Sequence, residues 1–188
     1  MRLRVCEGLD GAGKTTTIEQ LLQNKRNNDL IYSKGIGSNT WLGKLARKFP
    51  STFLFLLELL YIQYKVIKPN LKKGKTVLQD RYDFSIITYP TAQRFYNKII
   101  TKILSPLIPE PDSLIHFHVD VNERIKRLKG DNNKYHKILS ENPNLIILRE
   151  RRYLHLYNQF SKSKIKIDTT NKSIKQSAKI LENFIKSH

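Results

Sequence analysis

Short hydrophobic runs alternate along this chain with longer segments in which hydrophobic residues recur every three or four positions. The short runs have the length and composition of buried strands, and they cover residues 2–7, 30–33, 76–79, 113–119 and 165–167. The longer segments have helical spacing, and they cover residues 15–25, 40–49, 52–71, 92–104, 121–128, 146–160 and 173–185. Strands that alternate with helices pair in parallel through right-handed crossovers. The pattern therefore predicts an α/β fold with a three-layer, doubly wound parallel sheet of about five strands.

The domain organisation follows from length and composition. The chain has 188 residues, 39% of them hydrophobic, and we find no internal repeat, Ser/Gly-rich linker or shift in composition. A single domain over residues 1–188 is expected, since this length is typical of one hydrophobic core. Ligands of such sheets bind at the carboxyl ends of the strands, so the residues that follow each hydrophobic run are the first candidates for function.

The charge balance points to an anionic partner. The chain carries 34 Lys and Arg against 16 Asp and Glu, a formal charge of +18, which suits nucleic acid, anionic lipid or a phosphate compound alike. Cys6 is the only cysteine, which excludes a disulfide framework and a cysteine-based zinc site and fits a reducing cytoplasm. The longest hydrophobic stretch, 53–62, is interrupted by Glu58 and is too short to span a bilayer. We expect a cytoplasmic protein that does not bind membranes.

The segment EGLDGAGKTT follows the first predicted strand and precedes the first predicted helix. Its pattern G-x-x-x-x-G-K-T is the phosphate-binding loop, in which glycines let backbone N–H groups and a helix N-terminus face phosphate oxygens. Lys14 adds a positive charge, and the Thr15 hydroxyl is a ligand for Mg²⁺. We predict a site for ATP or another nucleoside triphosphate with Mg²⁺, formed by Gly8, Leu9, Asp10, Gly11, Ala12, Gly13, Lys14, Thr15 and Thr16. The loop alone leaves hydrolase, switch and transferase open.

A second candidate group ends the predicted strand 76–79, where the chain reads DRYDFS. The Asp80 carboxylate suits Mg²⁺ or its bound waters, and the Arg81 guanidinium can bind a phosphate through two parallel hydrogen bonds.

Four motifs stand in a characteristic order along the chain: EGLDGAGKTT, DRYDFS, PDSLIHFHVDV with a following KR, and IDTTNKSI. In order and spacing they resemble the thymidylate kinase family of the P-loop nucleoside monophosphate kinases, over most of the chain. The resemblance implies transfer of the ATP γ-phosphoryl group to thymidine monophosphate (dTMP), which yields the diphosphate. It also implies the P-loop kinase fold, a short lid at about 126–136, and a homodimer.

The resemblance also assigns roles to individual residues. It places Asp10 on the acceptor deoxyribose, Arg81 on the acceptor phosphate and Asp80 near the metal, and it makes Arg127 the arginine that reaches the transferring phosphates. Further acceptor contacts are implied for Ser85 and Tyr89, and an adenine contact for the loop that contains Thr170. The attacking phosphate oxygen is already ionised at neutral pH, so no general base is needed. Catalysis then rests on cations, for which the candidates are Lys14, Arg81, Arg127 and Mg²⁺.

Two positions differ from the family pattern. After the second predicted strand, Lys34 stands where the family carries an arginine for the acceptor phosphate, and leucines stand at or near the two positions that read thymine, Leu56 and Leu60. A kinase for another pyrimidine nucleotide or for a nucleoside is therefore an alternative. A nucleic-acid-binding P-loop ATPase is a second alternative, from a different class. The scattered basic residues, with few aromatic residues among them, argue against nucleic acid as the partner.

Two further features have a structural and a functional interpretation. The predicted helix 52–71 begins with a stretch, 53–64, that is hydrophobic on all sides, which suits either a buried helix or the interface of the expected homodimer. His116 and His118 alternate and so share one face of the fourth predicted strand. No third ligand follows at metal-binding spacing, so we expect the two imidazoles to be packing residues.

Overall fold

The computed structural model describes residues 2–23, 29–49, 51–88, 95–130 and 134–187. Contacts within the chain group it into two compact units. Unit 1 consists of Met1–Cys6 and Asn28–Ser113, and unit 2 of Glu7–Asn27 and Leu114–His188.

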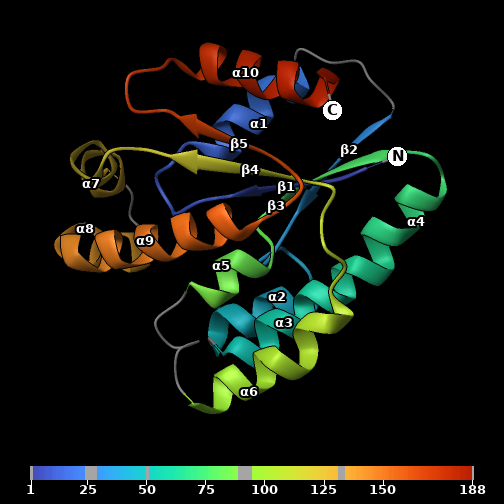
Figure 1. Ribbon diagram of the computed structural model, residues 1–188. Coiled ribbons are helices and arrows are strands. Elements are labelled where there is room, and N and C mark those ends of the chain that lie inside the picture. Colours follow the sequence, from blue (N-terminus) through green and yellow to red (C-terminus); the bar gives the residue numbers. More distant parts are fainter. Residues whose placement is uncertain (1, 24–28, 50, 89–94, 131–133, 188) are drawn as a thin grey trace. The chain divides into compact units, whose positions relative to one another are not determined.

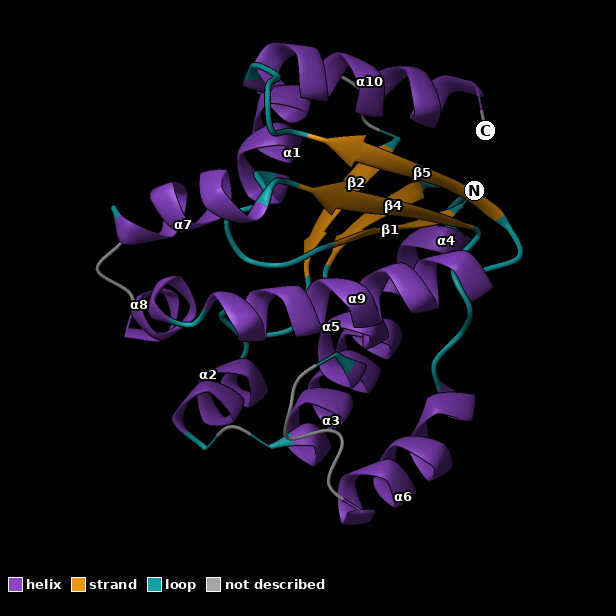
Figure 2. Ribbon diagram, turned by 60° about the vertical axis from the view of Figure 1, so that its left-hand side comes forward, coloured by secondary structure: helices purple, strands orange, loops and turns teal. Residues whose placement is uncertain are grey.

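The strands match the sequence pattern. They are β1 (Leu3–Glu7), β2 (Leu30–Lys34), β3 (Thr76–Asp80), β4 (Ser113–His118) and β5 (Ser163–Asp168). Their order in the sheet is β2-β3-β1-β4-β5, and the strands are drawn in orange in Figure 2. The predicted α/β fold, a five-stranded parallel sheet flanked by helices, is confirmed.

Unit 1 is built on β1, β2 and β3. Both β1 and β2 pair with β3 in parallel, with Leu3 opposite Val77 and Leu30 opposite Thr76. The helical segments are α2 (Trp41–Lys48), α3 (Thr52–Ile62), a π-helical segment (Gln63–Ile67), α4 (Lys68–Lys72), α5 (Asp83–Ile87), α6 (Phe95–Leu104) and a short 3-10 turn (Ser105–Leu107). Thr40 and Ser51 cap α2 and α3 by accepting a hydrogen bond from the backbone N–H three residues later. The core includes Leu56, Leu59, Ile62, Ile67, Val77 and Leu78, all nearly or fully buried.

Unit 2 holds the remaining elements: α1 (Lys14–Gln23), β4, α7 (Val121–Lys129), α8 (Lys134–Glu141), α9 (Pro143–Gln159), β5 and α10 (Ile174–Ser187). Helices α1 and α10, the first and last of the chain, pack against each other, as Figure 1 shows. The Asp120 carboxylate caps α7 by accepting from the Asn122 N–H at 2.8 Å. Buried side chains of this unit include Ile18, Leu21, Phe117, Leu128, Ile146 and Leu181.

The structure refines the predicted helices. The predicted helix 52–71 is helical over its whole length, but its hydrogen bonding changes at 63–67, where the π-helical segment separates α3 from α4. Two short helices, α5 and α8, were not predicted from the spacing. The predicted lid, 126–136, takes in the end of α7, the start of α8 and residues 131–133, which lie outside the described residues. Within the described ranges, we find no helix that is both long enough and apolar enough to cross a membrane.

Candidate active site

The phosphate-binding loop connects β1 to α1 in unit 2. Gly8, Gly11 and Gly13 have φ angles of +140°, +79° and +76°, which other residues rarely adopt. A Cβ at Gly8 would also overlap the carbonyl group of Phe117. Leu9 and Ala12 are fully buried, so these two residues of the predicted site offer only backbone atoms to a ligand. The loop shape therefore depends on the glycines that the motif specifies.

Lys14 is the first residue of α1, and its ammonium folds back over the loop. Its Nζ donates to the carbonyl oxygens of Gly8 at 2.7 Å and Leu9 at 3.1 Å, and the residue is 5% exposed. Thr15 and Thr16 are exposed at the helix N-terminus. A buried cation and a helix N-terminus together favour an anion at this position.

Arg127 of α7 joins the loop to the segment that follows β5. One guanidinium nitrogen, Nη1, donates to the carbonyl of Gly11 at 3.3 Å and to the Thr169 hydroxyl at 3.1 Å, and Nη2 donates to the Thr169 carbonyl at 3.0 Å. Its Nε donates to Glu123 one helical turn earlier, at 3.0 Å. The KR motif, the phosphate-binding loop and the IDTTNKSI motif thus meet in unit 2.

Thr169 and Thr170 hold the segment that follows β5 through side-chain and backbone hydrogen bonds. The Thr169 hydroxyl donates to the Ala12 carbonyl at 3.1 Å, and its N–H donates to the His118 carbonyl at 2.9 Å. The Thr170 hydroxyl donates to the Asp168 carboxylate at 2.6 Å, and the Thr170 N–H donates to the same oxygen at 2.9 Å. Burial opposes ionisation of Asp168, but these two hydrogen bonds outweigh it and the pKa of Asp168 is lowered.

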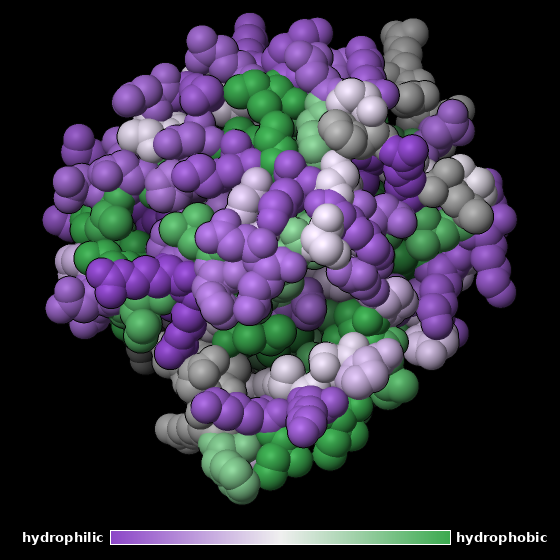
Figure 3. All heavy atoms as spheres, in the orientation of Figure 1, coloured by the Kyte–Doolittle hydropathy of each residue, from purple (hydrophilic) through white to green (hydrophobic). Residues whose placement is uncertain are grey.

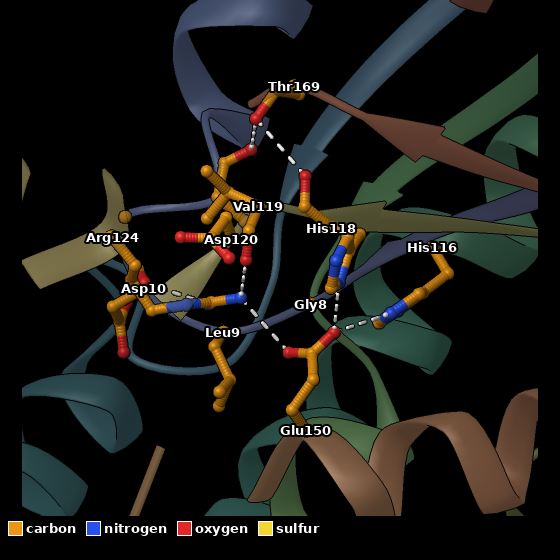
Figure 4. Close-up of polar contacts among 12 residues, drawn as sticks. Gly8, Leu9, Asp10, His116, His118, Val119, Asp120, Arg124, Glu150 and Thr169 are labelled. Carbon is orange, nitrogen blue, oxygen red and sulfur yellow. Dashed lines mark hydrogen bonds and ion pairs between the residues drawn. The ribbon is translucent and has the colours of Figure 1, made fainter. Parts of the chain in front are cut away.

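A cluster of charged and polar side chains, Arg124, Glu150, His116 and His118, lies next to the loop (Figure 4). Arg124, 1% exposed, donates from Nη1 to the Asp10 carbonyl at 3.2 Å and from Nη2 to the Val119 carbonyl at 3.2 Å and to Glu150 Oε2 at 3.0 Å. Burial lowers the pKa of Arg124, while Glu150 and Asp10 act in the opposite direction. The guanidinium is therefore a buried support of the loop backbone.

Glu150 of α9 is the acidic member of this cluster. Its Oε1 lies 3.2 Å from His116 Nε2 and 2.7 Å from His118 Nδ1. Burial raises the pKa of Glu150, but the hydrogen bonds with the two histidines and the Arg124 charge outweigh burial and hold the pKa well below its usual range. Sequence spacing did not single out Glu150, because it is 34 residues from His116 and on a different element. No third ligand follows the histidines at short sequence spacing, but the fold brings Glu150 to both of them.

The Asp10 side chain, predicted to contact the acceptor sugar, lies beside a residue of the predicted lid. Its Oδ1 is 3.7 Å from Nε2 of His136, and these side chains are 13% and 19% exposed. The structure therefore connects the phosphate-binding loop to α8 as well as to α7.

The residues predicted to hold the acceptor phosphate, Lys34 and Arg81, lie in unit 1, at the carboxyl ends of β2 and β3. Lys34 and Asp80 are opposite each other in the register, and the Gly35 N–H donates to the Asp80 carbonyl at 2.8 Å. Lys34 is exposed, whereas Asp80 is buried and its carboxylate accepts from the Tyr32 hydroxyl at 3.3 Å. The unit thus brings Lys34, Asp80 and Arg81 together, as the motif positions predicted.

Arg81 has an unusual backbone. Its φ of +70° makes it the only non-glycine residue with positive φ within the described part of the chain, and its N–H donates to the Cys6 carbonyl at 2.9 Å. Such a conformation costs about 1–3 kcal/mol and is concentrated at functional sites. Ser85 is buried in α5, 3% exposed, and Tyr89 lies outside the described residues.

A second residue that sequence reasoning missed is Glu58. Although it lies in the hydrophobic helix α3, its side chain is fully buried and accepts from four donors. Oε2 accepts from the Gly37 N–H at 2.8 Å, and Oε1 accepts from the Ser38 N–H at 3.0 Å, the Ser38 hydroxyl at 2.8 Å and the Thr40 hydroxyl at 3.2 Å. Glu58 therefore anchors the loop that follows Lys34.

Comparisons with known proteins agree with the motifs. The family model described as thymidylate kinase matches residues 6–180. A probable thymidylate kinase of Methanocaldococcus jannaschii is 30% identical over 192 residues, covering 97% of this chain and 95% of that protein. A thymidylate kinase of Fervidobacterium nodosum is 29% identical, covering 76% of this chain and 87% of that protein.

A solved structure shows the same fold. It is a thymidylate kinase from Candida albicans, with a TM-score of 0.75 and 22% identity, covering 99% of this chain and 91% of that one. The family match extends over the phosphate-binding loop, the DRY segment and the residues after β5. We conclude that this chain belongs to the thymidylate kinase family.

Proposed function

We propose that the chain transfers the γ-phosphoryl group of ATP to the 5′-phosphate of dTMP. The observation that carries this proposal is the convergence of Lys14, Arg127 and Thr169 on the phosphate-binding loop, in a chain of the thymidylate kinase family. In the reaction, an acceptor phosphate oxygen bonds to the γ-phosphorus while the bond from that phosphorus to the β–γ bridging oxygen breaks, so that ADP leaves.

The residues of this chain would act through charge and position. Lys14 and the N-terminus of α1 bind the donor phosphates, and Arg127 lies against the same loop, where it can stabilise charge that develops during transfer. Arg81 and Lys34 would hold the acceptor phosphate in unit 1. A side chain acting as base is not required, because the acceptor oxygen is ionised near neutral pH, with a second phosphate pKa of about 6.

We also propose a Mg²⁺ requirement. The exposed Thr15 hydroxyl at the start of α1 and the Asp80 carboxylate at the end of β3 are the hard oxygen ligands that Mg²⁺ prefers. When bound, Mg²⁺ neutralises charge on the phosphates. Thr15 belongs to unit 2 and Asp80 to unit 1.

A second copy of the chain is the partner we propose for unit 1. Phe95, Ile99 and Ile103 follow one another at four-residue spacing on α6 and are 80%, 45% and 65% exposed. Figure 3 shows hydrophobic side chains gathered over the region where Figure 1 draws α6. Helix α6 packs on α3, within the predicted dimer segment 52–71. Light scattering of the purified protein should give a dimer mass, and Ile103→Glu should reduce it to that of one chain.

We further propose that residues 1–188 work as one kinase domain in the cytoplasm. The only cysteine, Cys6, is buried in β1, so the fold needs no oxidising compartment.

An acceptor panel tests the proposed function directly. ADP release would be measured by a coupled assay with ATP, Mg²⁺ and dTMP, dUMP, UMP, CMP or GMP as acceptor. We expect release that depends on dTMP. Release without acceptor, or only with a polynucleotide, would support the P-loop ATPase alternative, and release with another pyrimidine acceptor but not dTMP would reassign the substrate.

A further inference from the structure

Three groups that commonly bind transition metals converge in unit 2, between β4 and α9. His116 and His118 are two residues apart on β4 and so point to one side of the strand, where Glu150 faces them from α9 (Figure 4). The atoms His116 Nε2, His118 Nδ1 and Glu150 Oε1 all lie within 4.8 Å of one another. Both elements are regular, so the three atoms are held by a rigid framework.

We propose that His116, His118 and Glu150 form a binding site for one transition-metal ion of the Zn²⁺ class, with a fourth position open to solvent. Two imidazoles and one carboxylate are an established ligand set for Zn²⁺. Ligand bonds of about 2.0–2.2 Å in a tetrahedron place the ligand atoms roughly 3.4 Å apart. Glu150 Oε1 is 3.2 Å and 2.7 Å from the two nitrogens, and the two nitrogens lie within 4.8 Å of each other, so small side-chain adjustments would bring the three atoms to these separations.

The surroundings of the cluster match those of a built metal site. Arg124 Nη2 holds the other carboxylate oxygen of Glu150 at 3.0 Å, which fixes its orientation, and the His116 ring stacks on Tyr153 with a centroid distance of 5.8 Å. Such outer partners tune the ligands of metal sites. His116 is 1% exposed, whereas the His118 side chain is 24% exposed and gives the ion a route from solvent.

The charge of the cluster selects the kind of ion. Two of the three ligand atoms are imidazole nitrogens, which favour Zn²⁺, Co²⁺, Ni²⁺ and Cu²⁺ over Mg²⁺ and Ca²⁺, and the Arg124 cation offsets part of the Glu150 charge that a hard cation would need. In the proposed complex the ring nitrogen that faces Glu150 binds the metal through its lone pair, and the other nitrogen of each imidazole carries the ring proton. The proposed ion is distinct from the Mg²⁺ of the proposed phosphoryl transfer.

Cobalt binding provides the test. The full chain, without a histidine tag, would be stripped with EDTA and titrated with Co²⁺ in the presence of excess Mg²⁺. We expect one Co²⁺ per chain, with the intense visible absorption of a tetrahedral complex, and displacement by one equivalent of Zn²⁺. His118→Ala and Glu150→Gln should each weaken Co²⁺ binding by at least about 100-fold, since even outer partners contribute 10–100-fold.

The control is His155→Ala, which removes an exposed histidine of the same helix α9 and should leave Co²⁺ binding unchanged. Circular dichroism would verify that each variant is folded, and His118→Ala, at the partly exposed ligand, decides the question if Glu150→Gln does not fold. The proposal is overturned if Co²⁺ does not bind at micromolar concentration, if it shows only the weak spectrum of the hydrated ion, if Mg²⁺ displaces it, or if His118→Ala binds it as the parent chain does.

Discussion

Replacing Glu58 by Gln should destabilise unit 1, although the two side chains have nearly the same shape. The carboxylate accepts four hydrogen bonds in a fully buried position. A Gln side chain has one acceptor oxygen, so in its best orientation the oxygen replaces Oε1 and the amide NH₂ faces the Gly37 N–H. That partly buried donor then loses its partner.

The size of the effect follows from hydrogen-bond energies. Loss of a bond to a charged acceptor costs about 1.5–3 kcal/mol, and the three remaining bonds weaken because their acceptor is no longer charged. The neutral side chain avoids the cost of burying a charge, which offsets part of this loss. We expect a net decrease of about 3 kcal/mol in the free energy of unfolding.

Urea unfolding followed by circular dichroism would measure the change. A loss of about 3 kcal/mol lowers the midpoint by about 1.5 M if the slope is near 2 kcal/mol/M. Glu141→Gln, at the exposed end of α8, is the matched control and should change stability by less than about 0.5 kcal/mol. A decrease below about 1 kcal/mol for Glu58→Gln would refute the claim that the carboxylate holds the loop after Lys34.

Three further substitutions test the site. Lys14→Ala should lower kcat by about 10²–10³-fold, because a fixed donor to the phosphates is lost, with an unchanged circular dichroism spectrum; a comparable loss of folded signal would instead make the lysine structural. Arg81→Ala should lower kcat/KM for dTMP by more than about tenfold while ATP binding, measured by calorimetry, is retained; Arg81→Gly should unfold at higher temperature than Arg81→Ala, since a left-handed conformation costs a residue with a Cβ about 1–2 kcal/mol. Gly8→Ala should reduce the melting temperature and abolish ATP binding, because its φ is +140° and its new Cβ would overlap the Phe117 carbonyl; a parent-like melting curve would contradict this.

The parts of the fold that depend on local sequence could be predicted. The phosphate-binding loop needs glycines at fixed positions, and its motif lies between a strand and a helix, as expected. The five strands appear within about two residues of their predicted limits, and the more deeply buried β1 and β3 are short, mostly hydrophobic runs, as expected of strands inside a parallel sheet. The predicted helix 52–71 is also helical, but its π-helical segment has no signature in hydrophobic spacing.

Contacts between distant residues could not be predicted in this way. Glu58 interrupts a hydrophobic helix, which from sequence alone indicates only a polar position, and its four donors lie about 20 residues earlier in the chain. Glu150 lies among many charged residues of α9, and its histidine partners are 32 and 34 residues away. Helix α5 has five residues, too few to establish a helical period.

The hydrogen bonds that Arg124, Arg127 and Thr169 donate to the phosphate-binding loop also have a consequence for synthesis of the chain. The side chains that bind the carbonyls of Asp10, Gly11 and Ala12 are those of Arg124, Arg127 and Thr169, which follow them by 114, 116 and 157 residues. Chains emerge from the N-terminus and their units fold as they are completed. A nascent chain that ends before β5 therefore has the complete nucleotide motif but lacks Thr169, so we expect nucleotide binding only after β5 and the residues that follow it have emerged.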